Sequence, residues 1–191
     1  YRDDLREYLK GGLWSAQAAA MRIAGSTDIY KPKIRGKNAS VNFLTCHDGL
    51  TLYDLYSYSW KHNEANGWEN RDGSDDNRSW NCGEEGPSRK KRVIRMRKQQ
   101  LRNAMVLLFL SQGTPLIMAG DEFGRTRKGN NNAYCQDNEI SWINWRLLDT
   151  NQDLYGFVKQ LIALRREHPV FHMAKEPALL DYKSVGMPDV S

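Results

Sequence analysis

The chain has 191 residues, of which 40% are hydrophobic and 27% charged, a composition typical of a globular protein with one core. No run of 18 apolar residues occurs, so the sequence predicts neither a membrane span nor a membrane partner. The three cysteines lie far apart without a Cys-x-x-Cys motif, which argues against a zinc site or a disulfide framework. Reduced thiols of this kind predict a cytoplasmic location.

The net charge of +5 is modest, and much of the excess lies in one segment, 89–102, where eight of fourteen residues are Lys or Arg. A nucleic-acid-binding surface is one interpretation of such a segment. However, apolar residues recur through it at helical spacing, and no aromatic residue for base stacking lies among the charges. These apolar residues are Ile94, Leu101, Met105 and Leu108. We therefore predict an amphipathic helix with a solvated basic face and no nucleic-acid partner.

In chain order, helical and strand patterns alternate. The spacing of apolar residues, with Gly and Pro as boundaries, predicts helices at 1–10, 13–24, 50–63, 89–112 and 152–167, and strands at 40–46 and 115–119. Leu154, Val158, Leu161 and Leu164 are expected on the buried face of the last helix. Long polar segments with Trp predict ordered loops at 64–88 and 125–145. Strand–helix alternation predicts an α/β fold with a parallel sheet.

Both predicted strands end in titratable residues. His47 and Asp48 follow the first strand, and Asp121 and Glu122 follow the second. Because the carboxyl ends of parallel strands meet at one edge of a sheet, these residues are expected to gather where ligands bind in such folds. The alternative is that the acids are structural, with Asp48 capping the next helix and Asp121 lying in a turn.

Carboxylates beside loops rich in Trp, Tyr and amide side chains suit a carbohydrate ligand. Aromatic rings can cover the apolar faces of sugars, while Asn, Asp and His bind their hydroxyl groups. Glycoside hydrolysis also requires carboxylates around a cationic, oxocarbenium-like transition state. Composition alone does not decide between this chemistry and the structural role.

Two long motifs carry a resemblance to a known family. The segments "VNFLTCHDGLTLYDLYSYSWKHNEANGWENRDGSDDNRSWNCGEEGP" and "SQGTPLIMAGDEFGRTRKGNNNAYCQDNEISWINW" resemble the isoamylase and glycogen-debranching branch of glycoside hydrolase family 13. The resemblance covers residues 1–175 and implies a (β/α)8 TIM barrel. The chain would supply the last strands and helices of that barrel, a mainly helical fragment, and residues 176–191 would be a linker toward an absent C-terminal β-domain.

The resemblance implies roles for particular residues. Asp48 matches the third catalytic acid of the family, which stabilises the transition state, and His47 matches the histidine that binds the same sugar ring. Leu50 and Cys46 depart from the residues common in the family at those positions, and neither departure alters the acid. The substrate-binding set is expected to comprise His47, Asp121, Asn130, Asn131, Asn132, Tyr134 and Asp137. For the amide-rich loop, the alternative is that its own Asx turns hold it together.

Other expected parts of the family's active site are missing. The Gly-x-Arg-x-Asp pattern that carries the nucleophile does not occur, and the first five or six strands would lie upstream of Tyr1. We therefore expect glycogen debranching by hydrolysis of α-1,6 branches as the family reaction, and an inactive isolated chain. A non-catalytic glucan-binding or regulatory remnant is the alternative. Branched α-glucan or maltooligosaccharide is the expected ligand, with no cofactor and with self-association or an upstream barrel-completing chain.

Overall fold

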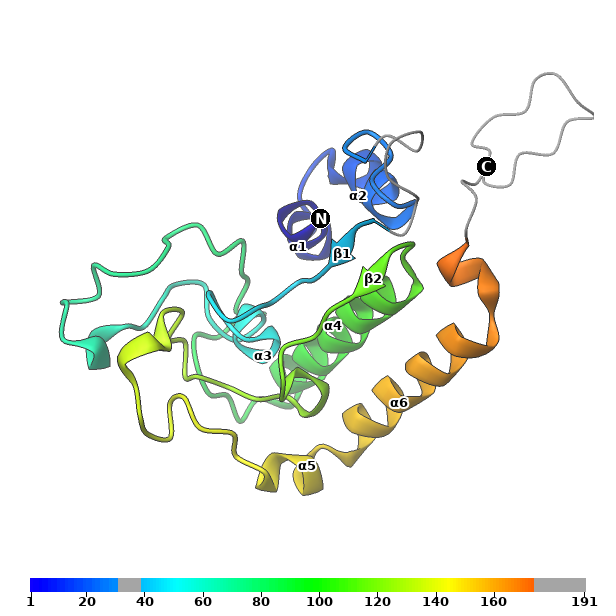
Figure 1. Cartoon of the computed structure of the whole chain (residues 1–191). Coiled ribbons are helices and arrows are strands. Elements are labelled where there is room, and N and C mark those ends of the chain that lie inside the picture. Colours follow the sequence, from blue (N-terminus) through cyan, green and yellow to red (C-terminus); the bar gives the residue numbers. More distant parts are fainter. Residues whose placement is uncertain (31–38, 174–191) are drawn as a thin grey trace, which may run out of the picture.

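The computed structural model describes residues 1–30 and 39–173, and it contains two parallel strands, β1 (Val41–Asn42) and β2 (Thr114–Pro115), with helices around them (Figure 1). The α-helices are α1 (Arg2–Lys10), α2 (Ser15–Ile23), α3 (Leu52–Leu55), α4 (Lys91–Leu110), α5 (Arg146–Thr150) and α6 (Gln152–Glu167). Short 3-10 turns are η1 (Glu64–Asn66), η2 (Asp121–Phe123), η3 (Ala133–Cys135) and η4 (Pro169–His172). Among these helices, none is long and apolar enough to cross a membrane.

The parallel pairing agrees with the sequence prediction, but the strands are shorter than predicted. Val41 lies opposite Thr114 and Asn42 opposite Pro115, whereas strands were expected over 40–46 and 115–119. Within the described residues each strand has one neighbour, and the regular ladder ends after two residues. The Leu116 amide still donates to the Asn42 carbonyl at 2.8 Å.

The helix predicted at 50–63 is wrong beyond its first turn. Its backbone carbonyls are taken by the following loop: the Trp80 amide donates to the Leu55 carbonyl and the Gly86 amide to the Ser57 carbonyl, both at 2.8 Å. Thr51 caps the short helix that remains, since its hydroxyl accepts a hydrogen bond from the Asp54 amide at 3.2 Å. Asp48 is therefore not the cap of α3.

The core lies between α1, α3, α4 and α6. The face of α4 that packs into it comprises Val93, Arg97, Leu101, Ala104, Met105, Leu108 and Phe109, and the buried side chains of α6 are Leu154, Val158 and Leu161. The predicted faces are correct except at Ile94 and Leu164, which are 39% and 36% exposed. In the first turns of α4, Val93 and Arg97 lie on the buried face, and Ile94 lies beside it.

A buried cation connects α4 to the loop that precedes it. Arg97 is 2% exposed, and its guanidinium donates to the carbonyls of Gly86 at 2.7 Å and Asn81 at 3.1 Å, and to that of Glu84. Charged hydrogen bonds of this kind satisfy backbone acceptors that would otherwise be buried without partners. Arg97 therefore fixes the end of the 64–88 loop on the helix.

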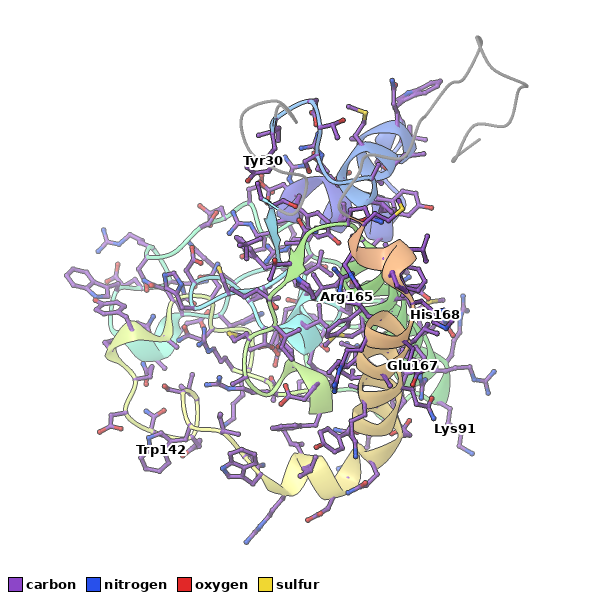
Figure 2. All side chains as sticks on the ribbon, turned by 45° about the vertical axis from the view of Figure 1, so that its right-hand side comes forward. Tyr30, Lys91, Trp142, Arg165, Glu167 and His168 are labelled. Atoms are coloured by element: carbon purple, nitrogen blue, oxygen red, sulfur yellow. The ribbon has the colours of Figure 1, made fainter. Side chains whose placement is uncertain are left out.

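A second arginine joins α6 to the opposite end of α4. Arg165 Nη1 donates to the carbonyls of Phe109 at 2.6 Å and Ser111 at 2.8 Å, and Nη2 donates to that of Gly113 just before β2. Figure 2 shows Arg165 on the side of α6 that faces the strands, with Glu167 and His168 near its end. The last helix is thus held against the β2 segment by charge as well as by its apolar face.

Replacing Arg97 with Leu should destabilise the chain by about 3 kcal/mol, because buried carbonyls lose their charged donor. The matched control is Arg92→Leu, an exposed position on the same helix, which should change the free energy of unfolding by less than about 0.5 kcal/mol. Urea denaturation followed by circular dichroism measures both. Equal losses from the two substitutions would contradict the anchoring role.

Candidate active site

His47 and Asp48 lie at the carboxyl end of the segment that contains β1, and the loop after β2 holds their backbone. Arg127 Nη1 donates to the His47 carbonyl at 3.1 Å, and the Gly49 amide donates to the Asn131 carbonyl at 2.9 Å. Both side chains are exposed to solvent. The two hydrogen bonds lie on either side of Asp48, so the backbone around it is held while the residue itself stays exposed to solvent.

The segment leading to these residues is fixed from α1. Arg6 Nε and Nη2 donate to the Leu44 carbonyl at 2.9 and 2.6 Å, and Nη1 donates to the Asn77 carbonyl at 3.1 Å. Burial lowers the pKa of Arg6 to about 10, which leaves it charged at neutral pH. Two arginines therefore position this segment. Arg6 binds the Leu44 carbonyl, and Arg127 binds the His47 carbonyl.

The electrostatics keep Asp48 ionised. The Cys46 thiol, whose sulfur lies 2.6 Å from Asp48 Oδ1, lowers the pKa of Asp48, and the charge of His47 acts in the same direction. Burial raises the pKa of Cys46, as does the Asp48 carboxylate. The site therefore presents a carboxylate and a protonated thiol at neutral pH, an arrangement suited to stabilising positive charge rather than to nucleophilic attack by sulfur.

Asp121 has a different environment from Asp48. Its side chain is 1% exposed, Oδ1 accepts from the Leu52 amide at 3.0 Å, and Oδ2 accepts from the Thr45 hydroxyl. Burial raises the pKa of Asp121 to about 7. Asp121 thus joins the β1 segment, the start of α3 and the turn after β2, which is the structural role considered as its alternative.

The two long loops are joined by amide side chains rather than by apolar packing. Figure 1 shows both loops on the same side of the molecule, away from α6. Asn63 Nδ2 donates to Asn131 Oδ1 and Asn131 Nδ2 to Asn77 Oδ1, both at 2.8 Å. The hydrogen-bonded set consists of eight amide side chains and the carboxylate of Asp72; the amides are those of Asn63, Asn66, Asn70, Asn77, Asn130, Asn131, Asn132 and Gln136. Buried amides paired in this way fix a single loop geometry.

The predicted substrate-binding residues fall into two groups. Asp121, Asn130 and Asn131 are buried with their polar atoms paired inside the chain, so the structure does not favour direct sugar contact by these three. An Asx turn in which the Asn132 amide donates to Asn130 Oδ1 at 2.9 Å agrees with the alternative of a self-supporting loop. The remaining residues keep accessible polar groups: His47, Asn132, Tyr134 and Asp137.

One exposed aromatic ring contacts this second group, since Trp142 donates from Nε1 to Asp137 Oδ1 at 2.9 Å. Tyr134, a member of the group, is 72% exposed, and Trp60 and Trp68 are also exposed. Figure 2 shows Trp142 at the outer edge of the molecule, far from Tyr30. Rings that water reaches on one side can cover the apolar face of a sugar.

A cavity of about 310 Å³ lies elsewhere, between α4 and the start of α6. Its apolar lining includes Leu101 and Leu154, and Asp153 at its rim accepts from Lys98 at 3.2 Å and from Arg102 at 2.9 Å. Neither His47 nor Asp48 lines it. We therefore place the candidate active site at the strand ends rather than in this cavity.

Comparisons with known proteins identify the family to which the chain is related. The chain is 52% identical over 171 residues to the glycogen operon protein GlgX homolog of Mycobacterium tuberculosis, covering 90% of this chain and 24% of that protein. It is 46% identical to the glycogen debranching enzyme of Serratia proteamaculans (88% and 25% covered) and 44% identical to the chloroplastic isoamylase 3 of Oryza sativa subsp. japonica (89% and 22%). No family model matches the chain.

Solved structures give the same assignment at the level of the fold. The pullulanase of Bacillus acidopullulyticus superposes with a TM-score of 0.66 at 20% identity, over 91% of this chain and 19% of that one. The type I pullulanase of Bacillus subtilis strain 168, solved with maltose, gives 0.62 at 26% identity (91% and 22%). The chain belongs to the glycogen debranching enzyme and isoamylase type of glycoside hydrolase family 13. It spans about a quarter of the length of the curated relatives it matches.

The burial of Asp121 predicts a measurable pH dependence. Its folded pKa of about 7 exceeds the ordinary value of 3.8, so the folded chain retains a proton that the unfolded chain has lost between these values. The contribution of Asp121 to the free energy of unfolding is therefore greatest in acid and declines as the pH rises to about 7. Between pH 5 and 8, the native sequence should lose stability relative to Asp121→Asn. Parallel pH profiles in chemical denaturation would contradict this.

The contact between the loops predicts a sharp difference between two glycines. Gly67 and Gly73 both have positive φ, at +80° and +71°, but a Cβ at Gly67 would meet nothing within 4 Å, whereas one at Gly73 would overlap Asn131 and lie 2.8 Å from Asn63 Nδ2. Gly67→Ala should cost about 1 kcal/mol from backbone strain alone. Gly73→Ala should cost about 1–3 kcal/mol more, because it separates the loops. Equal losses in urea denaturation would show that the loops do not pack as described.

Proposed function

We propose that this chain supplies one side of an active site that hydrolyses α-1,6 branches of glycogen or a starch-like glucan. The observation that carries the proposal is an exposed carboxylate with a lowered pKa, Asp48, next to His47 in the segment that follows parallel strand β1. Retaining glycoside hydrolysis passes through an oxocarbenium-like transition state, which an ionised carboxylate stabilises. In this proposal Asp48 has that role and His47 donates a hydrogen bond to a hydroxyl of the same sugar.

The loops extend the proposed site into a groove. Asn132, Tyr134 and Asp137 offer amide, phenol and carboxylate groups beside exposed aromatic rings, a set that suits a chain of glucose units. In this proposal, three buried residues hold the loops in place and do not contact the glucan: Asp121, Asn130 and Asn131. The type I pullulanase solved with maltose supports an α-glucan as the ligand class.

The proposed chemistry needs two further carboxylates, a nucleophile and a general acid, about 5–5.5 Å apart for a retaining enzyme. We infer that residues 1–175 are the last part of a (β/α)8 barrel whose earlier strands supply both, so that the 191 residues alone do not hydrolyse glucan. A non-catalytic glucan-binding role is the second candidate, since glucan binding by the exposed polar and aromatic side chains needs no further carboxylates.

Exposed apolar side chains support the need for a further barrel segment or a second copy of the chain. Leu13 and Trp14, between α1 and α2, are 88% and 95% exposed, and Val41 of β1 and Leu116 just after β2 are also exposed. Apolar surface and unpaired strand edges of this kind favour association. The three free thiols are consistent with a reducing compartment, and a cytoplasmic location remains part of the proposal.

Complementation tests the proposal. The 191-residue chain is combined with the missing N-terminal portion of a related debranching enzyme, and the release of α-1,6-linked chains is measured. The mixture should be active, and Asp48→Asn should lower its rate at least about a hundredfold, because the transition-state charge loses its partner. Asp149→Asn, an exposed acid in α5, is the matched control and should keep the rate.

Two outcomes would count against the proposal in different ways. Glucan cleavage by the 191-residue chain alone would mean that the nucleophile and general acid are already present. An active mixture that is unaffected by Asp48→Asn would remove the catalytic role of Asp48 while leaving the barrel assignment intact.

A further inference from the structure

Three consecutive side chains at the end of the β1 segment offer three different donor atoms. Cys46 presents sulfur, His47 nitrogen and Asp48 oxygen, and all of these atoms lie within 4.8 Å of one another. Among residues 1–30 and 39–173, they form the one group of at least three His, Cys, Asp or Glu side chains that converges in this way. A search for paired cysteines does not detect this group, because it contains one cysteine.

We propose that Cys46, His47 and Asp48 bind a thiophilic divalent metal ion, with Zn²⁺ as the best match, as an inhibitory ion rather than a cofactor. Thiolate, imidazole and carboxylate are the ligand types that zinc takes in proteins, and three of them leave a fourth tetrahedral position for water. At ordinary zinc–ligand lengths, two donors on one ion are about 3.5 Å apart. The Cys46 and Asp48 donors, now at 2.6 Å, must separate by about 1 Å, while His47 turns inward.

The backbone of the group is held and its side chains are reachable. Arg127 fixes the His47 carbonyl and Asn131 fixes the Gly49 amide, so the ligands can adjust by side-chain rotation alone. His47 and Asp48 are exposed, and Cys46 is partly exposed, so an ion can enter from solvent. Little ordering is therefore required when the ion binds.

The surrounding charges set the strength of binding. Arg2, Arg6 and Arg127 all lie near the group and repel a dication. Each is already engaged, Arg2 with Asp3 at 3.0 Å and the other two with backbone carbonyls. Binding must also release the thiol proton. These costs make the ion exchangeable, as an inhibitor is, rather than permanently bound.

A bound ion would occupy Asp48 and His47, the two groups proposed to meet the sugar. Metal and glucan would then compete for one site. This consequence rests on the proposed function, whereas binding of the ion does not, and the two are measured separately.

Cobalt titration tests the site directly, because Co²⁺ replaces Zn²⁺ and gives a thiolate-to-cobalt charge-transfer band. The 191-residue chain, kept reduced and free of oxygen, should give a saturable band at one equivalent, and added Zn²⁺ should bleach it. Cys46→Ser should abolish the band, and His47→Ala should weaken cobalt binding at least about tenfold. Cys135→Ser is the matched control, since this exposed cysteine lies in η3, and it should change nothing.

No charge-transfer band on the native chain, or a band that survives Cys46→Ser, would overturn the proposal. Near-ultraviolet circular dichroism of each variant shows whether it is folded. Cys46→Asp keeps three ligands but removes the sulfur. This variant should still bind Zn²⁺ in a calorimetric titration but give no charge-transfer band with Co²⁺. If the metal binds as expected but maltotetraose does not weaken it, the metal site stands and the shared glucan site fails.

Discussion

The candidate site depends on two hydrogen bonds that fix the backbone around Asp48 to the 125–145 loop, which follows β2. The Arg127 guanidinium donates to the His47 carbonyl, and the Asn131 carbonyl accepts from the Gly49 amide. Because both contacts are made to backbone, they fix the position of the carboxylate without using the carboxylate itself. The carboxylate proposed to act on the sugar is thereby left exposed on a fixed backbone, the arrangement that binding and catalysis require.

Each of these two contacts has its own support, and the supports are polar. The Arg127 amide donates to buried Asp54 at 2.7 Å, whose pKa is raised by burial, and the Thr126 hydroxyl donates to the same carboxylate at 2.5 Å. Asn131 is held by Asn63 and Asn77 from the other loop. Buried acid and amide side chains thus support both residues that fix the backbone around Asp48. Substituting one of these side chains should therefore shift the position of Asp48.

Sequence periodicity predicted the helices that pack by one apolar face. The bounds of α6 agree with the predicted 152–167, and α1 and α4 agree to within one or two residues at each end. The helix at 50–63 could not be limited to α3 from its sequence, since the loop partners that end it, Trp80 and Gly86, are 25 or more residues away. Strand length was overestimated for a similar reason, because a ladder depends on its neighbours.

At the candidate site, the strand-end pattern singled out His47, Asp48 and Asp121 but could not separate an exposed acid from a buried one. Asp48 and Asp121 look alike in sequence, and only burial distinguishes the exposed carboxylate from the one bound to Leu52 and Thr45. The positioning residues Arg6 and Arg127 were missed, because an arginine that binds distant carbonyls has no local signature. The asparagines in "HNEAN" and "NNN" were a usable signal for the paired loops.

A glucan titration followed by heteronuclear NMR shows whether the segment around Asp48 binds sugar. With maltotetraose added to the 191-residue chain, the amide signals of His47 and Asp48, and those of the 132–137 loop, should shift together along one saturable curve. Signals of Leu101 and Leu154 in the cavity between α4 and α6 should stay in place. Shifts confined to that cavity, or no shift of His47 and Asp48 at saturating sugar, would show that the glucan does not bind at this site.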